Sequence, residues 1–209
     1  MRLTIAATIL LLSVSNAHAE TTTASTSYGS VSDFLHKTNS QLRVELKGDL
    51  NSDGLEDWAG VVFRETDEEN NIHIKLVILT RSPDGRYVAS VSTKEAEDQK
   101  NGSDWWDVEI KKSSIYINLH GKTCCEYSST MYQFSFYKNI WRLVGIESNR
   151  SNLEELSSEK ISINMITGDG IYISEDGKGK RKMRHKKLSN EIFLLKDFDF
   201  TSSYGLQPQ

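Results

Sequence analysis

The stretch MYQFSFYKNIWRLVGI, residues 131 to 146, predicts two strands joined by a tight turn. Lys138-Asn139 separates the segment 131–137 from the segment 141–146, and both are rich in aromatic and aliphatic residues. Asn tolerates the left-handed backbone conformation that a tight hairpin turn requires. The stretch therefore predicts a β-hairpin, and the segments before and after it extend the same pattern.

Other runs also show the period of two that is typical of strands with one buried face. Apolar side chains alternate with polar ones in residues 106–111 and 115–120, while residues 72–79 alternate at first and then become apolar throughout. Because both side-chain positions are apolar near Leu79, we expect the far end of that strand to be buried on both faces. The pattern predicts antiparallel strands.

Turn-forming residues fall between these runs, at Ser82-Pro83-Asp84-Gly85, Lys112-Ser113-Ser114 and Asp176-Gly177-Lys178-Gly179. The short spacing between strands favours a meander over βαβ units. We therefore expect a mostly β protein, an antiparallel meander of hairpins forming an open or partial-propeller-like sheet. One or two short helices are expected in addition: the first at 31–39 with Ser30 or Ser32 as N-cap, and 152–158 as the candidate for a second.

The N-terminus predicts export. Arg2 precedes an apolar run over 3–13, and Ala17-His18-Ala19 gives the small-x-small pattern of a signal-peptide cleavage site. The run is shorter than the roughly 20 residues that span a bilayer, so we expect no transmembrane segment. We expect a signal peptide over 1–19, a flexible lead-in over 20–30 and a single β-rich domain over 31–209. The expected location is the periplasm or the medium.

Composition narrows the class of protein further. The 209 residues are 37% hydrophobic and 26% charged, which is typical of a globular chain, and the net charge of −4 argues against a general nucleic-acid binder. Only two cysteines are present, so the fold must depend on a core or a metal. They are adjacent, Cys124 and Cys125, and three states remain open for them: a strained vicinal disulfide, pairing with another chain, or free thiols.

An acidic loop, Gly-Asp-Leu-Asn-Ser-Asp-Gly-Leu-Glu-Asp at 48–57, predicts a calcium site. Calcium takes six to eight hard oxygen ligands, which alternate residues of a curled loop can bring together. Gly54 permits the sharp turn, but position 12 of an EF-hand loop is Gly60, so we expect a loop between strands. A solvated turn is the alternative. The expected ligands are the side chains of Asp49, Asn51, Asp53 and Asp57 and the carbonyl of Leu55.

This loop, followed by Trp58-Ala59-Gly60-Val61-Val62, resembles the calcium-binding hairpin of FG-GAP and VCBS-type repeats. The resemblance covers about ten to fifteen residues and one copy, where propellers carry several. It implies the same ligand set and a structural calcium ion. A looser similarity, over 132–145 and 162–168, connects the chain with single-copy exported bacterial proteins that carry the hairpin upstream. It supports the compartment and the fold and implies no activity.

A basic run lies near the C-terminus. It puts seven cations in ten residues, while the rest of the mature chain carries 17 basic and 29 acidic side chains. The run fits a solubilising edge strand, which we favour, or a docking site for an anionic lipid, cell-wall polymer or acidic protein. Its cations are Lys178, Lys180, Arg181, Lys182, Arg184, Lys186 and Lys187.

These features predict a non-enzymatic, calcium-stabilised binding or structural protein of the cell envelope, acting on an unknown protein or envelope component. The alternative is a periplasmic inhibitor or immunity protein that neutralises an exported enzyme or toxin. The chain shows no zinc-protease spacing, nucleophile elbow or phosphate-binding loop. An enzyme is therefore the third hypothesis.

Overall fold

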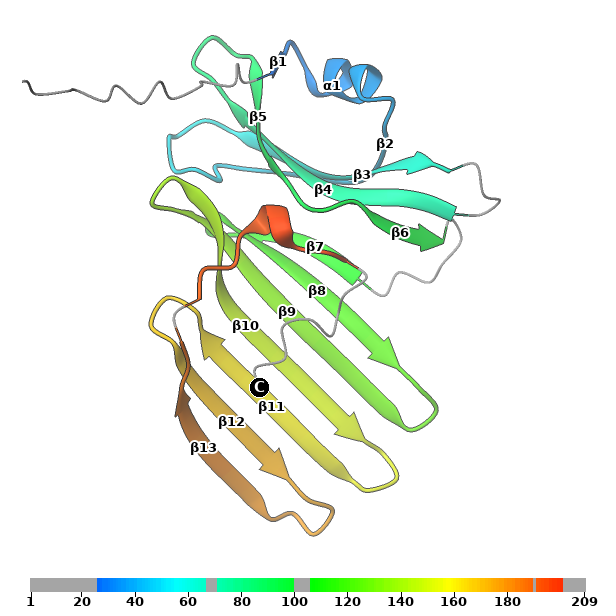
Figure 1. The fold of residues 1–209 in the computed structure, drawn as a ribbon, viewed down its shortest axis with the longest axis vertical. Coiled ribbons are helices and arrows are strands. Elements are labelled where there is room, and N and C mark those ends of the chain that lie inside the picture. The colour runs from blue at the N-terminus through cyan, green and yellow to red at the C-terminus, as the bar shows by residue number, and fades with distance from the viewer. Residues whose placement is uncertain (1–25, 67–70, 100–105, 190, 201–209) are drawn as a thin grey trace, which may run out of the picture.

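The computed structural model describes residues 26–66, 71–99, 106–189 and 191–200, so the expected signal peptide lies outside it. Two open antiparallel sheets, a short α-helix and a 3-10 turn make up this part of the chain (Figure 1). The predicted fold class is confirmed. No helix among the described residues is long and apolar enough to cross a bilayer.

The smaller sheet has six strands in the order β1-β5-β4-β3-β2, with β6 also paired to β4. Trp58 and Val62 on β3 face one side of it, and Ala59 and Val61 face the other. The bounds are β1 Ser27–Tyr28, α1 Val31–Lys37, β2 Gln41–Gly48, β3 Asp57–Glu65, β4 Asn71–Arg81, β5 Tyr87–Ser92 and β6 Ala96–Gln99.

The larger sheet has seven strands in chain order, each paired with its sequence neighbours. Its turns at Lys112-Ser113 and Lys138-Asn139 have positive φ at both residues, as tight hairpins require. The bounds are β7 Trp106–Lys111, β8 Ser114–Lys122, β9 Glu126–Tyr137, β10 Ile140–Asn152, β11 Ser157–Asn164, β12 Asp169–Glu175 and β13 Arg181–Lys187, followed by η1 Leu195–Asp197.

Helix α1 covers the outer face of the smaller sheet. Ser30 caps the helix by accepting a hydrogen bond from the Asp33 N–H at 3.1 Å. Phe34 packs against Trp58 with ring centroids 5.8 Å apart, and Leu79 is buried in the same cluster. This layer explains why β4 is buried on both faces at its far end, as its sequence predicts. Tyr28 joins the cluster through β1, so the last residues of the expected lead-in belong to the fold.

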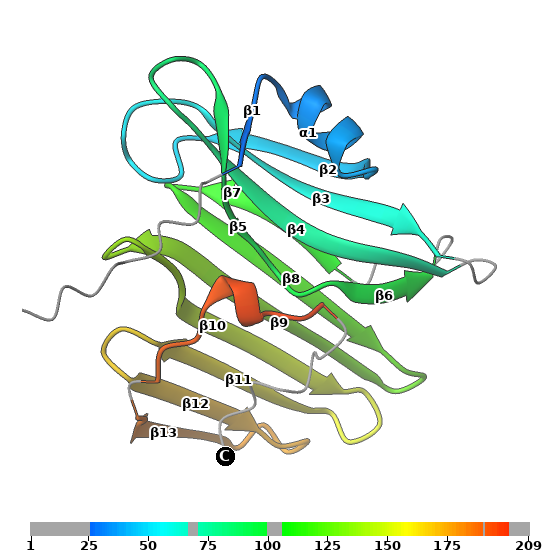
Figure 2. The same cartoon turned by 45° about the horizontal axis from the view of Figure 1, so that its top comes forward.

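One core lies between the two sheets. It combines inward side chains of β3 and β4 with those of β7 to β10. The C-terminal segment carrying η1 lies over the larger sheet on the side of the smaller one (Figures 1 and 2). It is held by hydrogen bonds from the Leu143 N–H to the Phe193 carbonyl and from the Lys94 N–H to the Phe198 carbonyl. Phe198 packs its ring against Tyr132 and Phe134.

The prediction of a helix over 152–158 is wrong. Residues 153–156 form the turn between β10 and β11, and Leu153 and Leu156 are 67% and 72% exposed. The Asn152 side-chain oxygen accepts the N–H groups of Glu154 and Glu155, each at 2.9 Å. Asn thereby closes a chain reversal, which satisfies the backbone groups that a helix would otherwise use.

Candidate functional site

The acidic loop between β2 and β3 gathers three of the expected calcium ligands. Asp49 Oδ1 and Asn51 Oδ1 both accept the Asp53 N–H, at 3.1 and 3.0 Å. Asp49 Oδ2 accepts the Gly54 N–H at 3.1 Å, and Asp53 Oδ1 accepts the Leu55 N–H at 2.8 Å. Gly54 has φ +85°, the left-handed conformation predicted for the sharp turn. The loop therefore curls around its own side-chain oxygens.

Asp57 anchors this loop to the smaller sheet. It is fully buried at the start of β3, where Oδ2 accepts the Leu50 N–H at 2.9 Å and Oδ1 accepts the Arg81 N–H at 2.8 Å. Burial raises the pKa of the Asp57 carboxyl, and the two backbone hydrogen bonds lower it in part. Because both oxygens accept N–H groups from separate segments, Asp57 joins the loop to the end of β4.

The oxygen donors of the loop fit calcium by chemistry, since they are carboxylate and amide oxygens. A cation at Asp49, Asn51 and Asp53 would compete with the loop N–H groups for the same atoms. Within the described ranges, no group of three or more His, Cys, Asp or Glu side chains is arranged as a metal site. Leu55, the expected carbonyl ligand, lies in the same loop and is half-buried.

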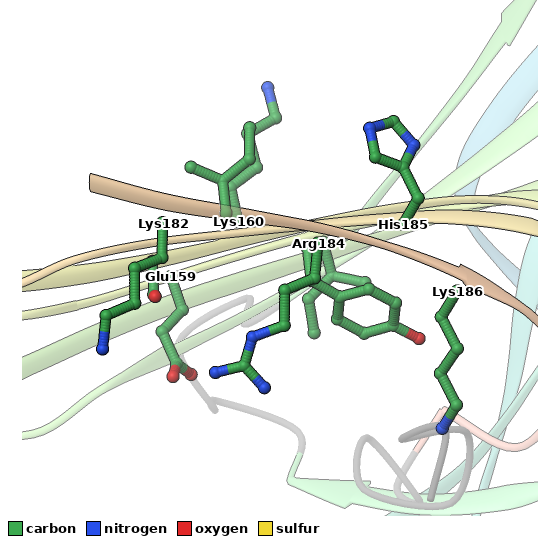
Figure 3. A pocket seen from close by; sticks show the side chains of 10 residues that line it. Glu159, Lys160, Lys182, Arg184, His185 and Lys186 are labelled. Atoms are coloured by element: carbon green, nitrogen blue, oxygen red, sulfur yellow. The ribbon is translucent and has the colours of Figure 1, made fainter.

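The basic run forms the turn into β13 and β13 itself, at the edge of the larger sheet. The register with β12 pairs Lys182 with Ser174, Arg184 with Tyr172 and Lys186 with Gly170. These three cations therefore project on the sheet face that carries the core. In Figure 3, Lys182, Arg184 and Lys186 point to one side, and Lys160 and His185 point to the other.

A hollow of about 440 Å³ lies at β11 to β13 and is lined by these three cations together with Glu159, Ile161 and Tyr172, among others (Figure 3). Glu159 projects on the same side as Lys182. Lys182 and Arg184 take part in no ion pair with any described residue. The hollow therefore combines positive charge with apolar surface.

Tyr172 contributes a polar atom to this hollow. Its ring packs against Gly170, where an added Cβ would lie 3.0 Å from Tyr172 Cε2. The hydroxyl is buried and has no hydrogen-bond partner in the part of the chain that the structure describes. Burial also raises the pKa of Tyr172. A buried hydroxyl without a partner costs free energy, which a ligand atom that accepted a hydrogen bond from it would recover.

Comparison with known proteins adds no relative: no protein-family model, curated protein or solved structure matches the chain.

The two cysteines lie in the turn between β8 and β9. Their Sγ atoms are 2.9 Å apart and both are free thiols. The Cys125 thiol donates to Glu154 Oε1 at 2.9 Å. Hydrogen bonds to Cys124 and to Glu154 raise the pKa of Cys125 to about 11.

A second polar cluster, on the outer face of β7 to β9, was not predicted from the sequence. His120 Nε2 lies 2.9 Å from Asp107 Oδ2, and the Tyr127 hydroxyl lies 3.3 Å from His120 Nδ1. Asp107 also accepts from Asn118 Nδ2 at 2.6 Å. The alternation did place Asp107 and His120 on polar faces of consecutive strands. Pairing those strands across the turn at Lys112-Ser113 would have brought the two side chains together.

Proposed function

We propose that this chain is an exported, calcium-stabilised, non-enzymatic binding protein of the cell envelope, and that it binds through the core face of β11 to β13. One observation carries the proposal. The core face of β7 to β10 packs into the core, but the same face continues to β13, where all seven residues are exposed. A sheet face with apolar and charged side chains and a hollow is a surface suited to a partner.

The charge of this surface indicates what kind of partner it suits. Lys182, Arg184 and Lys186 stand in a row on one face, in a chain with net charge −4. Segregation of cations on one strand attracts anionic groups and speeds encounter with them. The partner is therefore an anionic component of the envelope, either a polymer or a protein.

The expected calcium site has a supporting role in this proposal. The loop from Asp49 to Asp57 lies at the end of the smaller sheet, joined through Asp57 to β4. A calcium ion there would stabilise the scaffold by mass action and would not contact the β13 surface. The export signal expected at 1–19 gives the compartment in which free calcium and envelope polymers are encountered.

A co-sedimentation assay with isolated cell-envelope material tests the binding function. The variant Lys182→Gln/Arg184→Gln/Lys186→Gln removes the three cations of the core face. The matched control, Lys122→Gln/Lys178→Gln/Lys180→Gln, removes the same charge from the end of β8 and from the turn that precedes β13. We expect the first variant to lose binding at least about tenfold and the control to keep most of it.

Salt gives a second readout in the same assay. Binding by wild type should fall as the Debye length shortens from about 10 Å at 0.1 M salt to about 3 Å at 1 M. Equal loss in both triple variants would show a general charge effect and would contradict a site on the core face. Binding that neither variant changes would contradict the proposed function.

A further inference from the structure

The outer edge of β13 is a strand edge that no other described strand covers. β13 stands at the end of the sheet order and pairs only with β12, over seven consecutive residues without a register shift. In an antiparallel sheet, a terminal strand directs half of its backbone N–H and C=O groups away from its neighbour. The edge of β13 can therefore accept a further strand.

The side chains of β13 decide which strand fits. Five of its seven residues are Lys or Arg, and all seven are exposed. Pairing β13 with a second copy of itself would place like charges in cross-strand contact, which destabilises a sheet. The charges thus oppose self-association and favour a strand of opposite sign.

The cations also lie on both faces of the sheet. Lys182, Arg184 and Lys186 project on the core face, while Arg181 and Lys187 project on the outer face. A strand added beside β13 would bring its own side chains within about 5 Å of these positions on either face. Acidic residues at alternate positions, all on the core face, would then each meet one of the three cations Lys182, Arg184 and Lys186.

We infer that β13 binds an extended acidic segment of a partner protein as an additional antiparallel or parallel strand of the larger sheet. This inference rests on the proposed binding function and names the class of its partner. Main-chain hydrogen bonds to the β13 edge supply affinity, and the cations select acidic side chains and set the register. One acidic side chain reaches past Arg184 into the hollow, where its carboxylate accepts a hydrogen bond from the Tyr172 hydroxyl.

Synthetic peptides test this inference without knowledge of the natural partner. The probe is an alternating Glu-Thr peptide long enough to match the seven residues of β13. A Gln-Thr peptide removes the charge. An otherwise identical Glu-Thr peptide with alternate backbone nitrogens methylated keeps the charge but cannot donate hydrogen bonds along one edge. Vesicles rich in anionic lipid present charge without any strand.

Binding is measured by titration calorimetry on the mature protein. We expect the Glu-Thr peptide to bind, and the Gln-Thr and N-methylated peptides to bind at least about tenfold more weakly, a difference of about 1.4 kcal/mol. The variant Lys182→Gln/Arg184→Gln/Lys186→Gln should bind the Glu-Thr peptide more weakly than wild type by a similar factor. Tyr172→Phe removes only the hydroxyl and should weaken binding of the Glu-Thr peptide several-fold. The melting temperature of each variant shows that it is folded.

Two outcomes would overturn the inference. Equal binding of the N-methylated and unmodified Glu-Thr peptides would show attraction by charge alone, with no added strand. Stronger binding to anionic vesicles than to the peptide would assign the surface to a membrane. If the peptide fails while the envelope assay still depends on Lys182, Arg184 and Lys186, only the strand-addition inference is lost. If both fail, the binding function is lost with it.

Discussion

At the scale of single residues, the buried carboxylate of Asp57 is the most constrained group in the acidic loop. Its two oxygens accept N–H groups from Leu50 and Arg81. Asp57→Asn would turn one acceptor into an amide that faces an N–H. In the absence of calcium we expect a loss of about 1 to 3 kcal/mol in the free energy of unfolding. Denaturant melts would check this, with the exposed neighbour Glu56→Gln as the control for lost charge.

The pKa of Asp57 adds a dependence on pH. Because burial raises this pKa above its unfolded value, the carboxyl stabilises the fold most below the unfolded pKa of 3.8, and this contribution is lost as pH rises through the folded pKa. Asp57→Asn cannot titrate. The destabilisation caused by Asp57→Asn should therefore be larger near pH 4 than near pH 7. A cost that is smaller at the lower pH would contradict the assigned direction.

The cysteine pair gives a further prediction at this scale. The pKa of Cys125 is about 11 because its thiol is held by Cys124 and Glu154, and the thiolate is the reactive form. Maleimide should therefore label Cys124, the exposed thiol, before Cys125 near pH 8. Glu154→Gln should speed labelling of Cys125, while Glu155→Gln should not. Peptide mass mapping distinguishes the two sites, and faster labelling of Cys125 in wild type would refute the prediction.

At the scale of elements, the strands and tight turns were predictable and their pairing was less so. Alternation in 106–111 and 115–120 identified β7 and β8, and Lys138-Asn139 marked a turn whose left-handed backbone the structure shows. A period of two tells which side chains share a face, but it does not tell which strands lie at an edge. The density of cations indicated an edge strand, and β13 does lie at the edge of the sheet, but the hollow beside it could not be predicted from the sequence.

The acidic loop is the element whose metal binding is to be tested. Adding calcium to chelated protein should raise the melting temperature. At a calcium concentration one hundred times the dissociation constant, the free energy of unfolding should rise by about 2.7 kcal/mol. Asp49→Ala and Asp53→Ala should abolish the rise, and the exposed Glu56→Ala should keep it. Differential scanning calorimetry gives the result directly. A wild-type melting curve that does not change with millimolar calcium would contradict the predicted calcium site.

The C-terminal segment is the element that sequence patterns described least well. Its strong contacts come from Phe198, which packs against Tyr132, Phe134 and Phe200. These contacts are formed by residues far apart in the chain, so no local period predicts them. Phe198→Ala should cost about 3 to 5 kcal/mol, while the exposed Lys196→Ala should cost little. Chemical denaturation of the two variants makes the comparison.

At the scale of the whole molecule, two sheets share a core at one end, and the larger sheet extends beyond it to an open basic edge (Figure 1). This division fits the proposal that the chain combines a stable scaffold with a binding surface. The core lies between the sheets and the acidic loop lies at the end of the smaller one, while the cations lie on β13, at the opposite end of the larger sheet from β7. Changes to the surface should therefore leave stability largely intact.

Export remains a prediction at this scale. Protein isolated from cells should begin at Glu20, since the cleavage pattern ends at Ala19. Intact-mass measurement on the periplasmic fraction would establish the N-terminus. Retention of Met1, or recovery from the cytoplasm, would contradict the assigned compartment.

The central claim is that the core face and edge of β11 to β13 form the binding surface, and amide hydrogen exchange tests it most directly. Exchange of the mature protein would be compared with and without isolated envelope material. We predict that protection increases at Arg181–Lys187 and at the β11 and β12 residues behind it. Protection confined to the outer face around Asp107 and His120, or to the acidic loop, with β13 exchanging at its free rate, would contradict the claim.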